Sequence, residues 1–152
     1  MKLFGSLMLL VCAPLALAGN GAEYPNEHVA AFAVEKLDVT TLPSALRPKH
    51  EKGKKTFSDY GFVTQKAEEN ESLVEAPNGG ARYSLKVLQQ SDSGIYVCFA
   101  LQSKDGSAAS FQRVVLLKRK SASDLLKGRE SFREFNGCPE IGGAGGDSSY
   151  GD

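Results

Sequence analysis

The stretch Tyr83-Ser84-Leu85-Lys86-Val87-Leu88-Gln89-Gln90-Ser91-Asp92-Ser93-Gly94-Ile95-Tyr96-Val97-Cys98 carries the local signals of two strands joined by a short turn. The two apolar-rich segments are residues 82–88 and 94–102, and Asp92 and Gly94 between them are typical turn residues. Successive side chains of a strand point to opposite faces. One face of the second segment therefore carries Tyr96, Cys98 and Ala100, and the other carries Ile95, Val97, Phe99 and Leu101.

This stretch resembles strands E and F of an immunoglobulin-like domain, in which a short Asp-x-Gly turn precedes a tyrosine and, two residues later, a core cysteine. The resemblance implies that Cys98 faces the core between two sheets and that the Tyr96 hydroxyl bonds back to the backbone. It implies structural roles for seven residues: Tyr83, Leu85, Leu88, Asp92, Gly94, Tyr96 and Cys98.

The resemblance covers residues 82–118, where the last segment, residues 111–118, would be strand G. It predicts an all-β fold, an immunoglobulin-like antiparallel β-sandwich of six or seven strands. Such a domain would be atypical, because no cysteine lies between Gly19 and Val97 and the chain has no tryptophan. The usual disulfide between the two sheets therefore cannot form.

Composition divides the chain into four parts. Residues 1–18 combine Lys2, a short apolar run and the small residues of Ala16-Leu17-Ala18, which is typical of a cleaved signal peptide. Residues 19–120 would be the immunoglobulin-like domain. Residues 121–139 carry an apolar stripe that predicts a short amphipathic C-terminal helix, starting near Ser123. Residues 140–152 are glycine-rich and predict a disordered tail.

The signal peptide predicts a secreted, extracellular protein, and no later segment is long and apolar enough for a membrane span. The formal net charge of the full chain is zero, with 18 basic and 18 acidic residues. We therefore expect no one-sided basic surface and no nucleic-acid partner.

Two cysteines remain once Cys12 leaves with the signal peptide, namely Cys98 and Cys138. An intramolecular bridge would close a loop of about 40 residues and stabilise the fold by roughly 4 kcal/mol on the chain-entropy model. The alternatives are a buried free Cys98 with Cys138 linking two chains, or two free thiols.

The apolar strip of Ile95, Val97, Phe99 and Leu101 is expected on the outside of the sheet and needs a cover. One hypothesis is that residues 121–139 fold back over it as a lid. The other is that it is an interaction face for a protein partner, with a homodimer among the possibilities.

No arrangement of residues in the sequence supports catalysis. His28 and His50 lie apart from other metal-ligating residues, and no nucleophile motif or phosphate-binding loop is present. We expect a non-enzymatic protein without a cofactor or metal. The sequence Asn70-Glu71-Ser72 matches the N-glycosylation motif, so Asn70 is a candidate modification site.

The leading functional hypothesis is a secreted immunoglobulin-like recognition module that acts through protein–protein contact. One alternative is a secreted precursor that releases a C-terminal peptide after Lys118-Arg119-Lys120. Another is a secreted β-barrel that carries a small apolar ligand.

Overall fold

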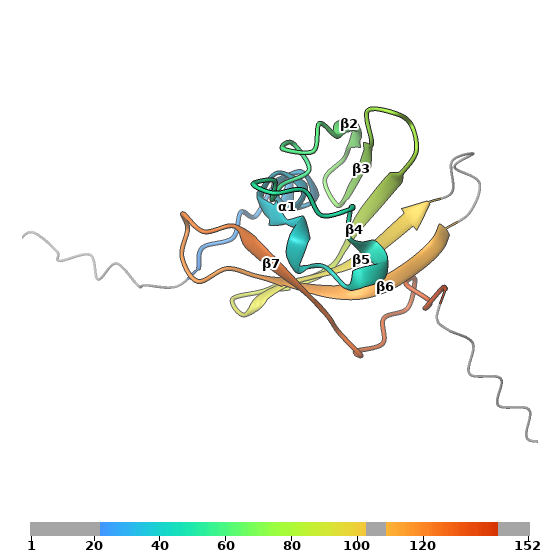
Figure 1. Ribbon diagram of the computed structural model, residues 1–152. Coiled ribbons are helices and arrows are strands. Elements are labelled where there is room, and N and C mark those ends of the chain that lie inside the picture. The colour runs from blue at the N-terminus through green and yellow to red at the C-terminus, as the bar shows by residue number, and fades with distance from the viewer. Residues whose placement is uncertain (1–21, 103–108, 143–152) are drawn as a thin grey trace, which may run out of the picture.

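The computed structural model describes residues 22–102 and 109–142. Within these residues one short α-helix and two 3-10 turns precede most of a seven-stranded sheet (Figure 1). The elements are α1 (Val29–Lys36), β1 (Leu37–Asp38), η1 (Val39–Thr41), η2 (Ser44–Leu46), β2 (Val63–Ala67), β3 (Glu71–Glu75), β4 (Arg82–Ser91), β5 (Gly94–Gln102), β6 (Ala109–Lys118) and β7 (Leu126–Glu130).

The strands lie in the order β1-β7-β6-β5-β4-β3-β2. Strands β2 to β7 form an antiparallel meander, and the two-residue β1 joins its far edge parallel to β7. The sheet curls into a half-barrel, with α1 on its inner side (Figure 1). The parallel pair makes this a mixed sheet.

The predicted immunoglobulin-like β-sandwich is therefore wrong, because the described strands form a single curled sheet and not two packed sheets. The inner face is closed by α1 and by the segment between β1 and β2, whose buried residues include Leu42, Leu46 and Phe57. A helix and irregular chain thus take the place of a second sheet in covering the apolar face.

The strands predicted around the opening stretch are confirmed. Residues 82–88 lie in β4 and residues 94–102 in β5, and the pairing continues to Ser91 opposite Gly94. Gly94 has a φ of 143°, and a Cβ there would lie 2.6 Å from the Leu117 carbonyl oxygen. The turn needs glycine at this position for both reasons.

The core lies on the inner face of the sheet. Ile95, Val97 and Phe99 of β5 are fully buried, and Leu101 is partly buried against the same cluster. The expectation that this strip lies outside the sheet as an interaction face is corrected, because α1 and residues 39–62 cover it. The cover is not the C-terminal segment that we expected as a lid.

Residues 121–139 contain strand β7, so the predicted C-terminal helix is also wrong. Leu126 and Gly128 face inward, and a Cβ on Gly128 would lie 2.9 Å from a methyl carbon of Leu42. The close approach of the Leu42 segment to β7 thus depends on this glycine. The predicted signal peptide at residues 1–18, and positions 143–152 of the predicted tail, lie outside the described residues.

Tyr83 on the inner face gives a prediction for stability at alkaline pH. Its ring packs 5.3 Å from Phe57, 5.6 Å from Phe62 and 5.7 Å from Phe99 between ring centroids. Burial raises the pKa of Tyr83 to about 12. The unfolded chain has the lower pKa, so it loses this proton first, and the free energy of unfolding should fall between about pH 10 and pH 12.

The fall attributable to Tyr83 is about 3 kcal/mol, two pKa units at 1.36 kcal/mol each. Denaturant unfolding across this pH range measures it, with Tyr83→Phe as the variant that lacks the titrating group. The same pH dependence in the wild type and Tyr83→Phe would contradict the assignment.

Candidate interaction site

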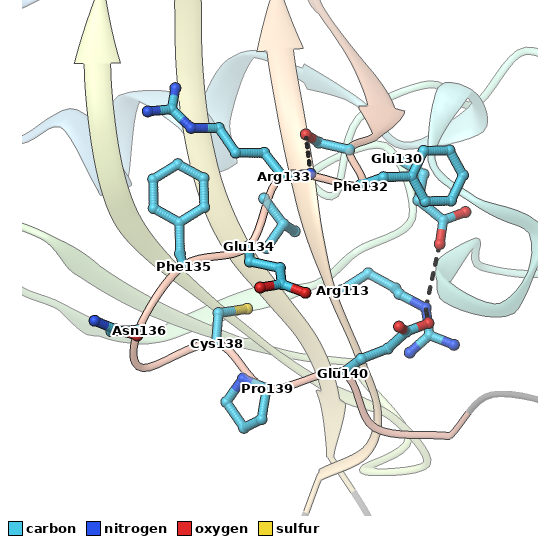
Figure 2. Close-up of a pocket in the computed structure, with 12 residues that line it drawn as sticks. Arg113, Glu130, Phe132, Arg133, Glu134, Phe135, Asn136, Cys138, Pro139 and Glu140 are labelled. Atoms are coloured by element: carbon cyan, nitrogen blue, oxygen red, sulfur yellow. Dashed lines mark hydrogen bonds and ion pairs between the residues drawn. The ribbon is translucent and has the colours of Figure 1, made fainter.

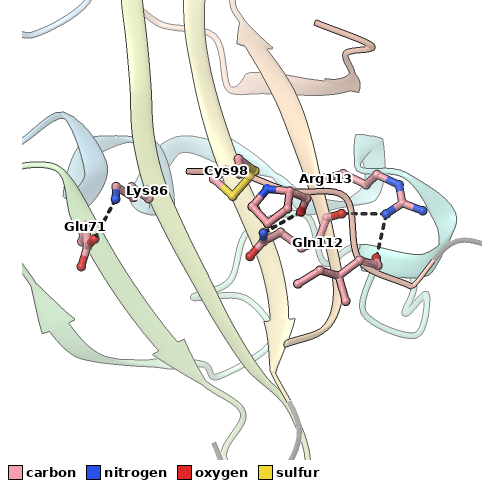
Figure 3. The surroundings of a disulfide bond; sticks show 8 residues. Glu71, Lys86, Cys98, Gln112 and Arg113 are labelled. Atoms are coloured by element: carbon pink, nitrogen blue, oxygen red, sulfur yellow. Dashed lines mark hydrogen bonds and ion pairs between the residues drawn. A yellow bond between two sulfur atoms is a disulfide. The ribbon is translucent and has the colours of Figure 1, made fainter. Parts of the chain in front are cut away.

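A disulfide joins Cys98 of β5 to Cys138, with an S–S distance of 2.07 Å and 5.5 Å between the Cα atoms (Figure 3). The predicted intramolecular bridge is confirmed. Cys98 is paired with Val114 in the register of the sheet and lies opposite to the Ile95–Phe99 face. Cys98 therefore faces the outer side of the half-barrel. The resemblance had implied that it faces the core, and that expectation is wrong.

Cys138 belongs to a segment that we call the C-terminal loop, residues 131–141. The loop leaves the sheet at Ser131, whose N–H donates to the Val114 carbonyl at 2.8 Å. It returns at Ile141, which exchanges two backbone hydrogen bonds with Gln112, of 2.9 and 3.2 Å. Both ends of the loop are thus fastened to β6, on either side of Arg113 (Figure 2).

Arg113 holds the two ends together. Its guanidinium Nε lies 3.2 Å from a carboxylate oxygen of Glu130 and 2.9 Å from one of Glu140. Its Nη1 donates to the Ile141 carbonyl at 2.7 Å, and the guanidinium carbon lies 4.2 Å from the centre of the Phe111 ring. The Arg113 side chain is buried, so its ion pairs and hydrogen bonds are charge-assisted contacts that are partly shielded from water.

The middle of the loop rests on the outer face of β5. The Phe135 ring lies 5.4 Å from that of Tyr96, and the Arg133 guanidinium stacks over both rings at 5.0 and 5.2 Å. Together with the disulfide, Val114 and Leu88, these rings form a small apolar cluster separate from the main core. The loop is therefore fixed at both ends and in the middle.

Phe132 stands apart from this packing, with 93% of its surface exposed (Figure 2). Among the described residues, Val63 of the edge strand β2 is the other strongly exposed large apolar side chain, at 56%. Beside Phe132 the loop borders a depression of about 350 Å³ whose floor includes Arg113 and Val114. An exposed phenyl ring on a fixed loop is a candidate contact point for another molecule.

The seven residues singled out by the resemblance lie in different places. Tyr83 and Leu85 are buried in the core on the inner face, whereas Tyr96 and Leu88 pack against the C-terminal loop on the outer face. Asp92 is exposed in the β4–β5 turn, where the side chain that hydrogen-bonds the backbone is that of Ser91, which accepts from the Ser93 N–H.

Asn70 lies exposed in the turn between β2 and β3. Its backbone carbonyl accepts a hydrogen bond from the Val87 N–H, so the side chain projects from a turn that is tied to β4. Glycosylation at Asn70 remains a prediction.

Two residues of the site were missed in the sequence. Arg113 points to the same face of β6 as Phe111 and Val115. A single charged residue among the apolar residues of that face was the sequence feature that could have indicated it. Phe132 and Phe135 both lie in the apolar stripe of residues 121–139, and no local pattern separates the exposed ring of Phe132 from the packed ring of Phe135.

Within residues 22–102 and 109–142, no cluster of three or more histidine, cysteine or acidic side chains could hold a metal ion. None of the helices in those ranges has the length and hydropathy of a membrane span. The chain matches no protein-family model, and no curated protein or solved structure is significantly similar to it.

Proposed function

We propose that this protein is a secreted, non-enzymatic recognition module that binds another protein through its C-terminal loop. The observation that carries the proposal is the exposure of Phe132 on a loop fastened by Arg113 and by Cys98–Cys138. A fixed loop loses little conformational entropy on binding, so more of its contact energy appears as affinity. The disulfide is consistent with an oxidising compartment, which supports secretion.

Phe132 would act as the anchor of the interface. Complete burial of a phenylalanine side chain contributes roughly 1.5–3 kcal/mol, which corresponds to about 10- to 100-fold in a dissociation constant. Aromatic anchors of this kind dominate many protein interfaces. The matching partner would offer an apolar pocket the size of a phenyl ring. Beside this pocket it would carry an acidic group for Arg133 and a basic group for Glu134, which follow Phe132 in the loop.

The precursor alternative is disfavoured by the contacts around Lys118-Arg119-Lys120. The Arg119 N–H donates to the Tyr24 hydroxyl at 3.3 Å, and its guanidinium lies 4.9 Å from the centre of the Phe32 ring. A chain cut after Lys120 would still be held by the pairing of β7 and by the disulfide. Cleavage there would therefore not release a peptide.

The ligand-carrier alternative has weaker support than the loop. The inner face of the sheet is packed with the rings of Phe57, Phe62, Tyr83 and Phe99, at centroid distances of 5.2 to 6.2 Å. These rings occupy the position where a carrier would need a cavity.

A photo-cross-linking experiment tests the proposal. A photoreactive phenylalanine analogue replaces Phe132 in one chain and Val63 in a control chain, because both positions are exposed and apolar. Each chain is irradiated in the extracellular fluid of its source. We expect a discrete product from position 132, which excess unlabelled wild type suppresses and excess Phe132→Ala does not.

The same products from positions 132 and 63 would contradict the proposal, as would equal suppression by wild type and Phe132→Ala. A product of twice the chain's mass would identify the protein partner as a second copy.

A further inference from the structure

The outer face of β6 and β7 carries cations that lie directly opposite one another. Lys118 is the register partner of Lys127, and Leu116 is the partner of Arg129, so all three charged side chains point outward around Leu116. The three are exposed and border a shallow depression of about 230 Å³. We call Lys118, Lys127 and Arg129 the β6–β7 patch.

Like charges directly opposite on neighbouring strands destabilise a sheet. Within the described residues, no carboxylate lies within ion-pair distance of the three patch side chains. Lys127 also has Asp38 of β1 as a register partner, but the Asp38 carboxylate accepts hydrogen bonds from the Thr40 N–H and hydroxyl instead. At the opposite end of the sheet, by contrast, Lys86 pairs with Glu71 and Arg82 with Glu75, each as a register partner and an ion pair. The β6–β7 patch therefore keeps an unneutralised charge that the fold itself does not require.

A fourth cation extends the patch along the outer face. Leu116 is the register partner of Tyr96 as well as of Arg129, and the Arg133 guanidinium lies over the Tyr96 ring. The row of Arg129, Leu116 and Tyr96 crosses three strands, which lie about 4.8 Å apart in a sheet. Cations thus occupy both ends of a row about 10 Å long, and Lys118 and Lys127 lie roughly 7 Å further along the strands.

This geometry favours a linear polyanion over a single small anion. The patch side chains are exposed, and the depression has no buried charged side chain that would hold one phosphate or sulfate. A polyanion gains from several contacts at once and from the release of its counterions. The disulfide is consistent with an oxidising compartment. For a secreted protein, a sulfated polysaccharide is a linear polyanion of the required chemistry.

We propose that the β6–β7 patch binds a sulfated polysaccharide. The formal net charge of zero conceals this surface, because it counts every charged residue of the chain regardless of where that residue lies. The choice of a sulfated polysaccharide rests on the secretion in the proposed function, whereas the patch itself is independent of the contact through Phe132.

The test uses the full oxidised chain with heparin as the sulfated polysaccharide. Affinity is measured for the wild type, for Lys127→Gln/Arg129→Gln, and for the control Lys66→Gln/Lys86→Gln, which removes the same charge from the paired end of the sheet. We expect about 10-fold weaker binding for the patch variant and less than 2-fold weaker binding for the control. The affinity of the patch variant should also depend less steeply on salt concentration than that of the wild type. The unfolding midpoint of the control should lie close to that of the wild type, because its substituted residues are exposed. That of the patch variant should be equal or slightly higher, because Lys127→Gln removes one of two like charges that lie directly opposite each other.

Equal weakening by the two variants would overturn the proposal, since net charge alone would then explain binding. So would unchanged affinity for fully desulfated heparin. Tighter binding to single-stranded DNA or to vesicles of anionic phospholipid, with the same dependence on Lys127 and Arg129, would assign the patch to a different polyanion.

Discussion

Replacing both Cys98 and Cys138 by serine is expected to lower the free energy of unfolding by about 4 kcal/mol. The bridge spans 40 residues of sequence, and closing a loop of that length removes roughly this much chain entropy from the unfolded state. The bridge also joins the outer face of β5 to the C-terminal loop, so the small cluster with Phe135 and Tyr96 should loosen. Denaturant unfolding of the double variant against the oxidised wild type measures the change.

The loss should be uneven along the chain. Arg113 still fastens both ends of the C-terminal loop in the double variant, whereas the middle of the loop is released. Hydrogen exchange of the backbone amide at position 138, which in the wild type donates to the Phe135 carbonyl, should accelerate more than that of the Ser131 amide. Reduced wild type is the matched control and should behave like the double variant; equal stability of the oxidised and reduced wild type would contradict this role of the bridge.

The variant Phe99→Ala is expected to destabilise the protein by about 4 kcal/mol, within the range for truncating a fully buried aromatic side chain. Phe99 is fully buried and packs against Phe57 and Tyr83, with centroid distances of 6.2 and 5.7 Å. A loss of this size is a large share of the stability of a domain this long. Thermal and denaturant unfolding would both report it.

Lys86→Ala is the matched control, because Lys86 is exposed on the opposite face of the neighbouring strand β4. Its substitution should change the free energy of unfolding by less than about 0.5 kcal/mol. A mild effect of Phe99→Ala, similar to that of the control, would mean that this face of β5 is not the core.

The β4–β5–β6 region could be predicted because its signals are local. Apolar-rich segments on both sides of Asp92-Ser93-Gly94 define two adjacent strands, and a hairpin pairs them without any long-range information. The sequence did not show which face of β5 packs in the core, since both faces of this strand are apolar. The bulkier series of Ile95, Val97 and Phe99 took the core, and Cys98 the outside.

The elements that cover the sheet depend on contacts distant in the chain. In α1 the fully buried positions are Ala30 and Ala33, whose small side chains add little to an apolar pattern in the sequence. In β7, Gly128 lowers the strand propensity locally, yet it admits Leu42 from a segment more than eighty residues away. At Gly128, tertiary packing overrode the local preference against a strand.

The site itself was only partly predictable. Cysteine counting pointed to the pair Cys98 and Cys138 as one of three alternatives, whereas the ends of the C-terminal loop depend on Arg113, a residue inside a strand. The β6–β7 patch was concealed for a different reason. A net charge of zero describes the whole chain. It does not show that the pairing of β6 with β7 brings Lys118 directly opposite Lys127.

If the C-terminal loop is a preformed contact surface anchored by Phe132, removal of this one ring must weaken the binding of the partner. The most direct measurement compares the dissociation constants of Phe132→Ala, Val63→Ala and wild type for the protein captured by cross-linking at position 132. We expect at least 10-fold weaker binding for Phe132→Ala and wild-type affinity for Val63→Ala. The unfolding free energies of Phe132→Ala and wild type should be equal, because the ring is exposed. Unchanged affinity of Phe132→Ala would contradict this role of Phe132.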